Sequence, residues 1–146
     1  IFVDPTLALS RLNQLRSADG IGPASGAFAS TDLRLEILRD MWDRGVKFVT
    51  GMDSGMTNAN FDDFAYIPEV MVEDMGITPM EAIVSATQVS ADCLGLLDEI
   101  GTLEEGKAAD VLIINGNPAE DIKALHSVNT IVKQGQIVKQ KNELLI

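Results

Sequence analysis

Residues 32–50 form the pattern that most restricts the fold of this 146-residue chain. Large apolar residues recur there at helical spacing and predict an amphipathic helix whose apolar face consists of Leu33, Ile37, Leu38, Met41 and Trp42. Ser30 or Thr31 is expected to cap the start of this helix, and Gly45 is expected to end it in a left-handed conformation. Residues 46–50 then predict a strand. A helix, a glycine and a strand in this order are typical of the αβ step of a parallel α/β fold.

The segments around this unit continue the alternation of strands and helices. Residues 1–5 predict a short strand that ends at Pro5, and residues 6–17 predict a helix with Leu7, Leu9, Leu12 and Leu15 as its apolar positions. A Gly/Ala/Ser-rich loop is expected over residues 19–30. A helix is predicted over 62–75, started or kinked by Pro68. Thr78-Pro79-Met80-Glu81 is a capping box, so we expect a further helix from there to residues 93–94, ended by Gly95.

From residue 100 onward the periodicity changes from helical to strand-like. Strands are predicted at 100–103, 109–115, 128–133 and 136–139, with one helical turn at 119–125. Gln134-Gly135 is a hairpin turn candidate between the last two strands. The sequence therefore predicts an α/β domain over residues 1–97 and a small antiparallel β domain over 98–146.

Charge restricts the kind of partner. The chain has a formal net charge of −11, which argues against nucleic acid and against anionic membrane surfaces as partners. Residues 61–110 contain 12 acidic residues and a single basic one, Lys107. Solvated helix faces are the simpler interpretation of this acidic segment, and a preference for metal ions or cationic substrates is the alternative.

The chain has one cysteine and one histidine, so few catalytic constellations are open to it. Cys93 is interpreted as an unreactive core thiol, and a chain with a single cysteine is expected in the reducing cytoplasm. His126 is interpreted as an exposed loop histidine. The sequence contains neither a Gly-x-Ser-x-Gly elbow nor a glycine-rich phosphate loop, which argues against a serine-type triad and a nucleotide site.

Asp53 is the carboxylate whose position is most informative. It follows the predicted strand 46–50 between small residues, in Gly51-Met52-Asp53-Ser54-Gly55. The carboxyl end of a parallel strand is where α/β folds place their active sites. A carboxylate that only caps its own loop is the equally weighted alternative at this point.

Three blocks in order along the chain resemble the amidohydrolase superfamily, and most closely its imidazolonepropionase and Xaa-Pro dipeptidase branch. The segment 45–55 is similar to the last barrel strand of that family, with Met52 where threonine is usual. Residues 76–87 resemble the helix that follows, and the Gly-Lys-Ala-Ala-Asp block at 106–110 resembles a signature near the C-terminus. The family is made up of (β/α)₈ barrels joined to a small β-sandwich. The resemblance implies that this chain is the C-terminal part of such an enzyme.

The resemblance also implies a chemistry and a site. The family uses a divalent metal to activate water, and zinc is the expected ion. Asp53 matches the aspartate that binds this metal and accepts a proton from the attacking water. Asn60 matches an asparagine that contacts the substrate, which is expected to be a small molecule or a dipeptide. The histidines and other ligands that the family places on earlier strands have no counterpart in these 146 residues.

Further expectations concern this polypeptide on its own. The polypeptide alone is expected to bind no metal and to be inactive, since a catalytic zinc takes three protein ligands. The first residue is Ile1 and not methionine, which fits a piece of a longer protein. Strand edges that the rest of a barrel would cover favour a homo-oligomer. Two alternatives stay open, namely a non-catalytic acidic α/β scaffold and a deaminase of the same superfamily.

Overall fold

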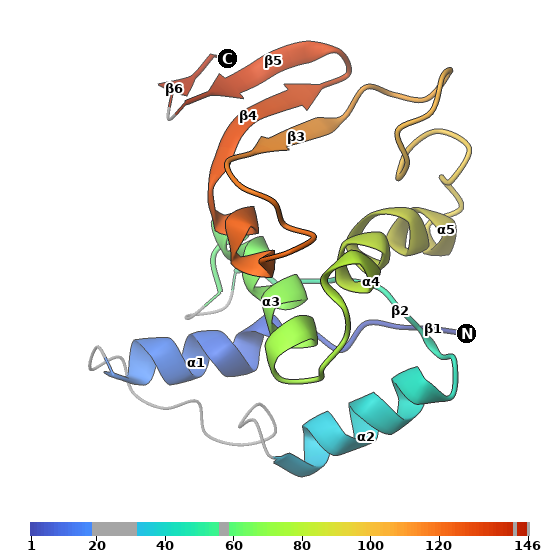
Figure 1. The fold of residues 1–146 in the computed structure, drawn as a ribbon, viewed down its shortest axis with the longest axis vertical. Helices are drawn as coiled ribbons and strands as arrows, with labels where there is room; N and C mark the ends of the chain where they lie inside the picture. Colours follow the sequence, from blue (N-terminus) through green and yellow to red (C-terminus); the bar gives the residue numbers. More distant parts are fainter. Residues whose placement is uncertain (19–31, 56–58, 142, 146) are drawn as a thin grey trace.

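The computed structural model describes residues 1–18, 32–55, 59–141 and 143–145 as an α/β structure with two separate sheets (Figure 1). Its α-helices are α1 (Ala8–Ala18), α2 (Asp32–Asp43), α3 (Tyr66–Glu73), α4 (Pro79–Val84) and α5 (Ser90–Cys93). Its strands are β1 (Phe2–Val3), β2 (Lys47–Phe48), β3 (Val111–Ile114), β4 (Val128–Lys133), β5 (Gln136–Gln140) and β6 (Glu143–Leu144). Two 3₁₀ turns, η1 (Phe61–Ala65) and η3 (Ile122–His126), and a π-helical turn, η2 (Ser85–Val89), complete the order. The predicted loop at 19–30 and the caps Ser30 and Thr31 lie outside the described residues.

The first sheet consists of β1 and β2, which are parallel as predicted. Phe2 pairs with Lys47 and Val3 pairs with Phe48. Gly45 has a φ of 80° and separates α2 from β2, which confirms the predicted stop. Trp42 of α2 packs edge-on against Phe48, with 5.6 Å between the ring centroids. The predicted αβ step is therefore correct.

The helices α1, α2 and α3 and the start of α4 supply side chains to one hydrophobic core around β2. The largest apolar side chains with less than 2% exposure are Leu7, Leu12, Phe48, Ile67, Val70 and Met71. The predicted apolar face of α2 was wrong in part, because Leu33 and Ile37 are 63% and 53% exposed. The residues of α2 that pack against the core are Leu35, Leu38, Met41 and Trp42. These four lie on one stripe, and at 100° per residue Leu33 and Ile37 fall to one side of it.

The capping box at Thr78 forms as predicted and opens the helical segment that contacts β2. Thr78 Oγ1 accepts from the Glu81 N–H at 3.4 Å, and Glu81 Oε2 accepts from the Thr78 N–H at 3.0 Å. Together, α4, η2 and α5 span the predicted helix to Cys93. The Ser85 hydroxyl within this segment donates to the carbonyl oxygen of Phe48 at 2.5 Å. Cys93 is exposed, so its interpretation as a core thiol was wrong; Ala91 is the residue of α5 that is buried.

The second sheet is antiparallel with the order β3-β4-β5-β6, and it lies at the opposite end of the molecule from α1 and α2 (Figure 1). Gln134 and Gly135 both have positive φ, 50° and 79°, which matches the predicted two-residue hairpin. The strand predicted at 100–103 does not form. Gly101 lies so close to α5 that an added Cβ would be 2.6 Å from the Cβ of Ala91, and Lys107 Nζ donates to Thr102 Oγ1 at 2.5 Å. These contacts hold residues 100–107 as turns.

The buried carboxylate of Glu69 joins the helical part to the segment before β4. Its side chain is 7% exposed, and Oε1 accepts from Arg11 of α1 at 3.0 Å. Oε2 lies 2.7 Å from Nε2 of His126, whose ring also meets Tyr66 at 4.6 Å between centroids. The prediction that His126 is exposed is correct, but its partners were not foreseen.

Loss of the Glu69 carboxylate should destabilise the protein. We expect Glu69→Ala to lower the free energy of unfolding by about 2 kcal/mol, because Arg11, whose side chain is 18% exposed, and His126 would lose a buried acceptor while Arg11 keeps Glu73 and Asp74. Urea denaturation measures this. The exposed Glu120→Ala is the control and should stay within about 0.5 kcal/mol of wild type. Equal effects of the two variants would contradict the role assigned to Glu69.

The free energy of unfolding should also depend on pH through the titration of Glu73. Hydrogen bonds from Lys123 and then Arg11 hold the pKa of Glu73 below its ordinary value of 4.5. A carboxylate whose pKa is lower in the folded state stabilises that state above its ordinary pKa, and this contribution is lost as the pH falls through the folded pKa. Glu73→Gln should therefore weaken the protein at neutral pH and reduce the further loss of stability below pH 4.5, as measured by urea midpoints. An acid dependence identical to wild type would contradict this.

Candidate active site

The segment after β2 carries Asp53 to the C-terminal end of the parallel strand pair. The backbone of Val49 still pairs with this sheet, because its N–H donates to the carbonyl of Val3 at 3.0 Å. Met52 is buried at 9% exposure, whereas Asp53 is exposed. Asp53 has a φ of 53°, a left-handed conformation that is uncommon for a residue other than glycine. Such backbone strain is concentrated at functional sites, and here it coincides with a strand end.

A second carboxylate at the same strand ends, Asp4, fixes the path of this segment. Asp4 follows β1, and its Oδ1 accepts from the Gly51 N–H at 3.0 Å and from the Thr6 N–H at 3.1 Å. A Cβ built on Gly51 would lie 1.7 Å from Oδ2 of Asp4. Only glycine therefore leaves room for this carboxylate. No sequence motif pointed to a role for Asp4, although its position directly after a parallel strand resembles that of Asp53.

Serine side chains of the α4–α5 segment hold the chain between β2 and Asp53. The Thr50 N–H donates to the Ser90 hydroxyl at 3.3 Å, and the Ser90 hydroxyl donates to the carbonyl of Ser85 at 2.8 Å. The backbone before Asp53 is thus held by side chains from two separate parts of the chain, Asp4 after β1 and Ser90 in α5. Asp53 itself is left exposed beyond these contacts.

Asn60 is brought to the same region by a short closed loop. The Gly55 N–H donates to the carbonyl of Ala59 at 3.0 Å, and the Ser54 hydroxyl lies 3.5 Å from the carbonyl oxygen of Asn60. Asn60 is exposed, and it is the N-cap residue of η1. Asp53 and Asn60 therefore flank the two ends of one loop. Thr57 and Asn58, which stand where the family has His-Gly, lie outside the described residues.

The described residues supply too few ligands for a catalytic metal. Among them, no group of three or more His, Cys, Asp or Glu side chains is close enough together to hold an ion. The lone histidine, His126, contacts Glu69 and not Asp53. The donor set around Asp53 in the described residues therefore falls short of the three protein ligands that a catalytic zinc takes.

Six of the 12 acidic residues in the segment 61–110 form ion pairs with basic side chains elsewhere in the chain. They are Asp63, Glu69, Glu73, Asp74, Asp92 and Asp110. Lys133 and the Gln134 N–H, for example, hold the pKa of Asp110 below its ordinary value. Two of these paired carboxylates, Asp63 and Glu69, are buried.

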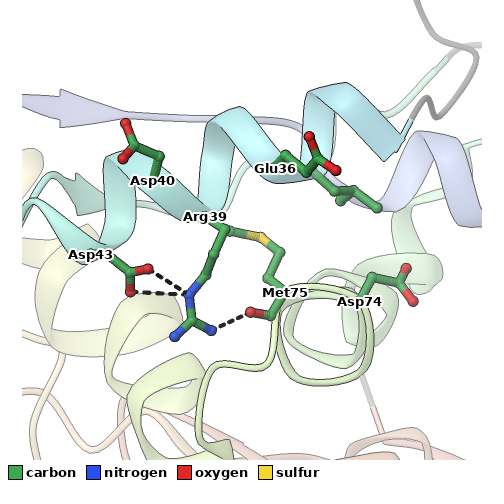
Figure 2. Close-up of a pocket in the computed structure, with 7 residues that line it drawn as sticks. Glu36, Arg39, Asp40, Asp43, Asp74 and Met75 are labelled. Atoms are coloured by element: carbon green, nitrogen blue, oxygen red, sulfur yellow. Dashed lines mark hydrogen bonds and ion pairs between the residues drawn. The ribbon is translucent and has the colours of Figure 1, made fainter.

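A groove of about 500 Å³ lies away from Asp53, between α2 and the residues that follow α3 (Figure 2). Arg39 crosses it, donating to Asp43 at 3.0 and 3.1 Å and to the carbonyl of Met75. Neither Asp53 nor Asn60 lines this groove. The guanidinium of Arg39 is already bonded to Asp43 and to the carbonyl of Met75. The groove is therefore a packing contact between α2 and the residues that follow α3.

None of the helices in the described part of the chain has both the length and the apolar character needed to cross a bilayer.

The contact of Asp4 with Gly51 can be tested by a double-mutant cycle. Gly51→Ala should cost about 2 kcal/mol of unfolding free energy, because the new methyl group would displace the Asp4 carboxylate. In an Asp4→Ala background the same substitution should cost much less, since the space is then empty. Urea denaturation of the four proteins measures the coupling. Equal costs of Gly51→Ala in both backgrounds would rule out the close approach.

Comparisons with known proteins find relatives that match most of this chain. An imidazolonepropionase of Brevibacillus brevis is 31% identical over 109 residues, which cover 73% of this chain and 26% of that protein. A 5-methylthioadenosine/S-adenosylhomocysteine deaminase of Moorella thermoacetica is 30% identical over 126 residues, covering 73% of this chain and 29% of that protein. The crystal structure of a Xaa-Pro dipeptidase with bound methionine matches with a TM-score of 0.72 at 29% identity, over 93% of this chain and 34% of that one.

This chain therefore spans about a quarter to a third of the length of the relatives it matches. The sequence profile described as "Amidohydrolase family" matches residues 2–138, which is most of the chain. The parallel strand pair, the exposed carboxylate at its C-terminal end and the capped helix after it all lie within the matched residues. The chain belongs to the amidohydrolase family.

Proposed function

We propose that this chain is the C-terminal part of an enzyme that hydrolyses a C–N bond in a small substrate, namely an amide, a peptide or a cyclic amidine. Residues 1–97 would be the last strands and helices of a (β/α)₈ barrel, and residues 98–146 would be strands of a small β-sandwich. The observation that carries the proposal is the exposed Asp53 in left-handed conformation at the C-terminal end of a parallel strand. That end is where barrel enzymes place their catalytic groups.

Asp53 would act as one ligand of a divalent metal, expected to be zinc, and as the acceptor of a proton from the attacking water. A bound divalent ion lowers the pKa of a coordinated water to about 7, which supplies a nucleophile at neutral pH. Asp53 is suited to both roles because Asp4 holds the backbone two residues before it and Met52 is buried, while Asp53 itself is exposed. The remaining ligands would come from residues other than those described here.

Asn60 would contact the substrate beside Asp53. Asn60 is exposed, and its carbonyl oxygen lies 3.5 Å from the hydroxyl of Ser54, the residue after Asp53. An amide side chain can donate to a carbonyl and accept from an amine or an amide N–H, so it suits a peptide as well as a cyclic amidine.

Deamination is the second candidate function. It is favoured by the 30% identity to the Moorella thermoacetica deaminase over 73% of this chain. Both reactions add water at a carbon bonded to nitrogen, and they differ in whether ammonia leaves. Incubating the full-length protein with Ala-Pro, imidazolonepropionate and 5-methylthioadenosine, followed by ammonia and product assays, separates the two. A protein that turns over none of them favours the non-catalytic scaffold.

Substitution of Asp53 tests the proposed chemistry directly. In the full-length protein Asp53→Asn should lower turnover at least about a hundredfold, because the amide is a poorer metal ligand and cannot accept the proton. Circular dichroism and the urea midpoint should stay near wild type, since the side chain is exposed. Asp98→Asn, another exposed carboxylate, is the matched control and should keep wild-type rates. Wild-type turnover in Asp53→Asn would end the assignment.

Self-association of this 146-residue polypeptide is a further expectation of the barrel proposal. In the described residues β1 and β2 pair only with each other, and such a two-stranded parallel sheet has unpaired backbone groups along its outer edges. We expect dimers or larger species in gel filtration with light scattering. A folded monomer at all concentrations tested would argue against exposed barrel edges.

A further inference from the structure

We infer that Asp63, held by Arg16 of α1, is a positioning residue that sets the place of Asn60 beside Ser54 and Asp53. The inference rests on the proposed function, because it assigns Asn60 a substrate contact. It adds two residues that no motif singled out, one of them 44 positions before Asn60 along the chain.

The contacts form a continuous path from Arg16 of α1 through Asp63 and Asn60 to Ser54. Arg16 Nη2 donates to both carboxylate oxygens of Asp63, at 3.0 and 2.8 Å. Asp63 Oδ2 accepts from the backbone N–H of Asn60 at 2.8 Å. The carbonyl of Asn60 in turn lies 3.5 Å from the Ser54 hydroxyl, one residue after Asp53. Asn60 is therefore bonded on one side to the carboxylate and on the other to the loop of Asp53.

The burial of this pair makes its geometry well defined. The Asp63 side chain is 10% exposed and that of Arg16 is 22% exposed. A charged side chain in such surroundings keeps its hydrogen bonds, because an unpaired buried charge is costly. Asp63 cannot turn away from Asn60 without also changing its two contacts to Arg16.

The neighbouring residues show why Asp63 differs from a surface carboxylate. Asp62 and Phe61, its neighbours in η1, are exposed, whereas Asp63 points inward toward α1. An ordinary cap of η1 would need only a carboxylate, with no partner across the fold. The arginine from α1 makes the position of Asn60 depend on the packing of a helix 47 residues away from Asp63.

The test is a set of kinetic variants of the full-length protein. KM and kcat are measured with whichever of Ala-Pro, imidazolonepropionate and 5-methylthioadenosine the wild type turns over. Asp63→Ala should raise KM about tenfold and change kcat less than about twofold. Asp63→Asn retains an oxygen that can accept from the Asn60 N–H, so it should raise KM less. Asp40→Ala, which breaks the Arg44–Asp40 pair on α2, is the matched control and should leave KM unchanged.

A double-mutant cycle with Asn60→Ala tests whether Asp63 acts on KM through Asn60. Asn60→Ala should raise KM by itself, and adding Asp63→Ala should then raise it less than about twofold further. A lower apparent kcat at unchanged KM in Asp63→Ala would mean that Asp63 only stabilises the fold, and this would overturn the inference. Independent, multiplying effects of the two substitutions, or an unchanged KM in Asn60→Ala, would also overturn it.

Failure of the proposed function would look different. Wild-type turnover in Asp53→Asn, or no turnover of any of the three compounds by the wild type, would overturn the proposed function and this inference with it. An active enzyme that depends on Asp53 but not on Asp63 would overturn the inference alone.

Discussion

The approach of the Asp4 carboxylate to the backbone of Gly51 is the contact on which the candidate site depends. It joins the ends of β1 and β2 where two parallel strands would otherwise diverge, and it leaves no space for a side chain at Gly51. With residue 51 fixed, the buried Met52 sets the direction of the chain, and Asp53 is turned outward in a left-handed conformation. The exposed carboxylate is thus a consequence of packing two residues earlier.

Ion pairs connect the helical part to η3, the turn that precedes the β4 strand of the antiparallel sheet. Glu69 lies on α3 with Arg11 of α1 on one oxygen and His126 of η3 on the other. Lys123 of η3 also pairs with Glu73, one turn further along α3. The same helix follows η1, whose N-cap residue is Asn60. The segment before β4 is therefore bonded to the helix that follows the candidate site.

Local signals in the sequence were sufficient for the elements that are stabilised locally. The capping box at Thr78, the left-handed Gly45 and the Gln134-Gly135 hairpin each depend on a few adjacent residues, and all three formed as predicted. Contacts between distant residues were not visible. The strand expected at 100–103 failed because Gly101 packs on α5, and Cys93 is exposed because Ala91 takes the inward position. In the candidate site, Asp53 and Asn60 were found by their order in a motif, whereas Asp4 and Asp63 act through partners 47 positions away.

The π-helical turn η2 (Ser85–Val89) determines which serine hydroxyl groups contact β2 and the residues that follow it. Residues five apart lie on different sides of a regular α-helix, about 140° from each other. The π-helical turn widens the coil, so that Ser85 bonds the carbonyl of Phe48 while Ser90 meets the amide of Thr50 and the carbonyl of Ser85 itself. Deleting a single residue from this turn would restore ordinary helical winding and rotate Ser90 away from Thr50 by roughly 100°. The extra residue in the coil thus lets one helical segment contact both Phe48 and Thr50 on the way to Asp53.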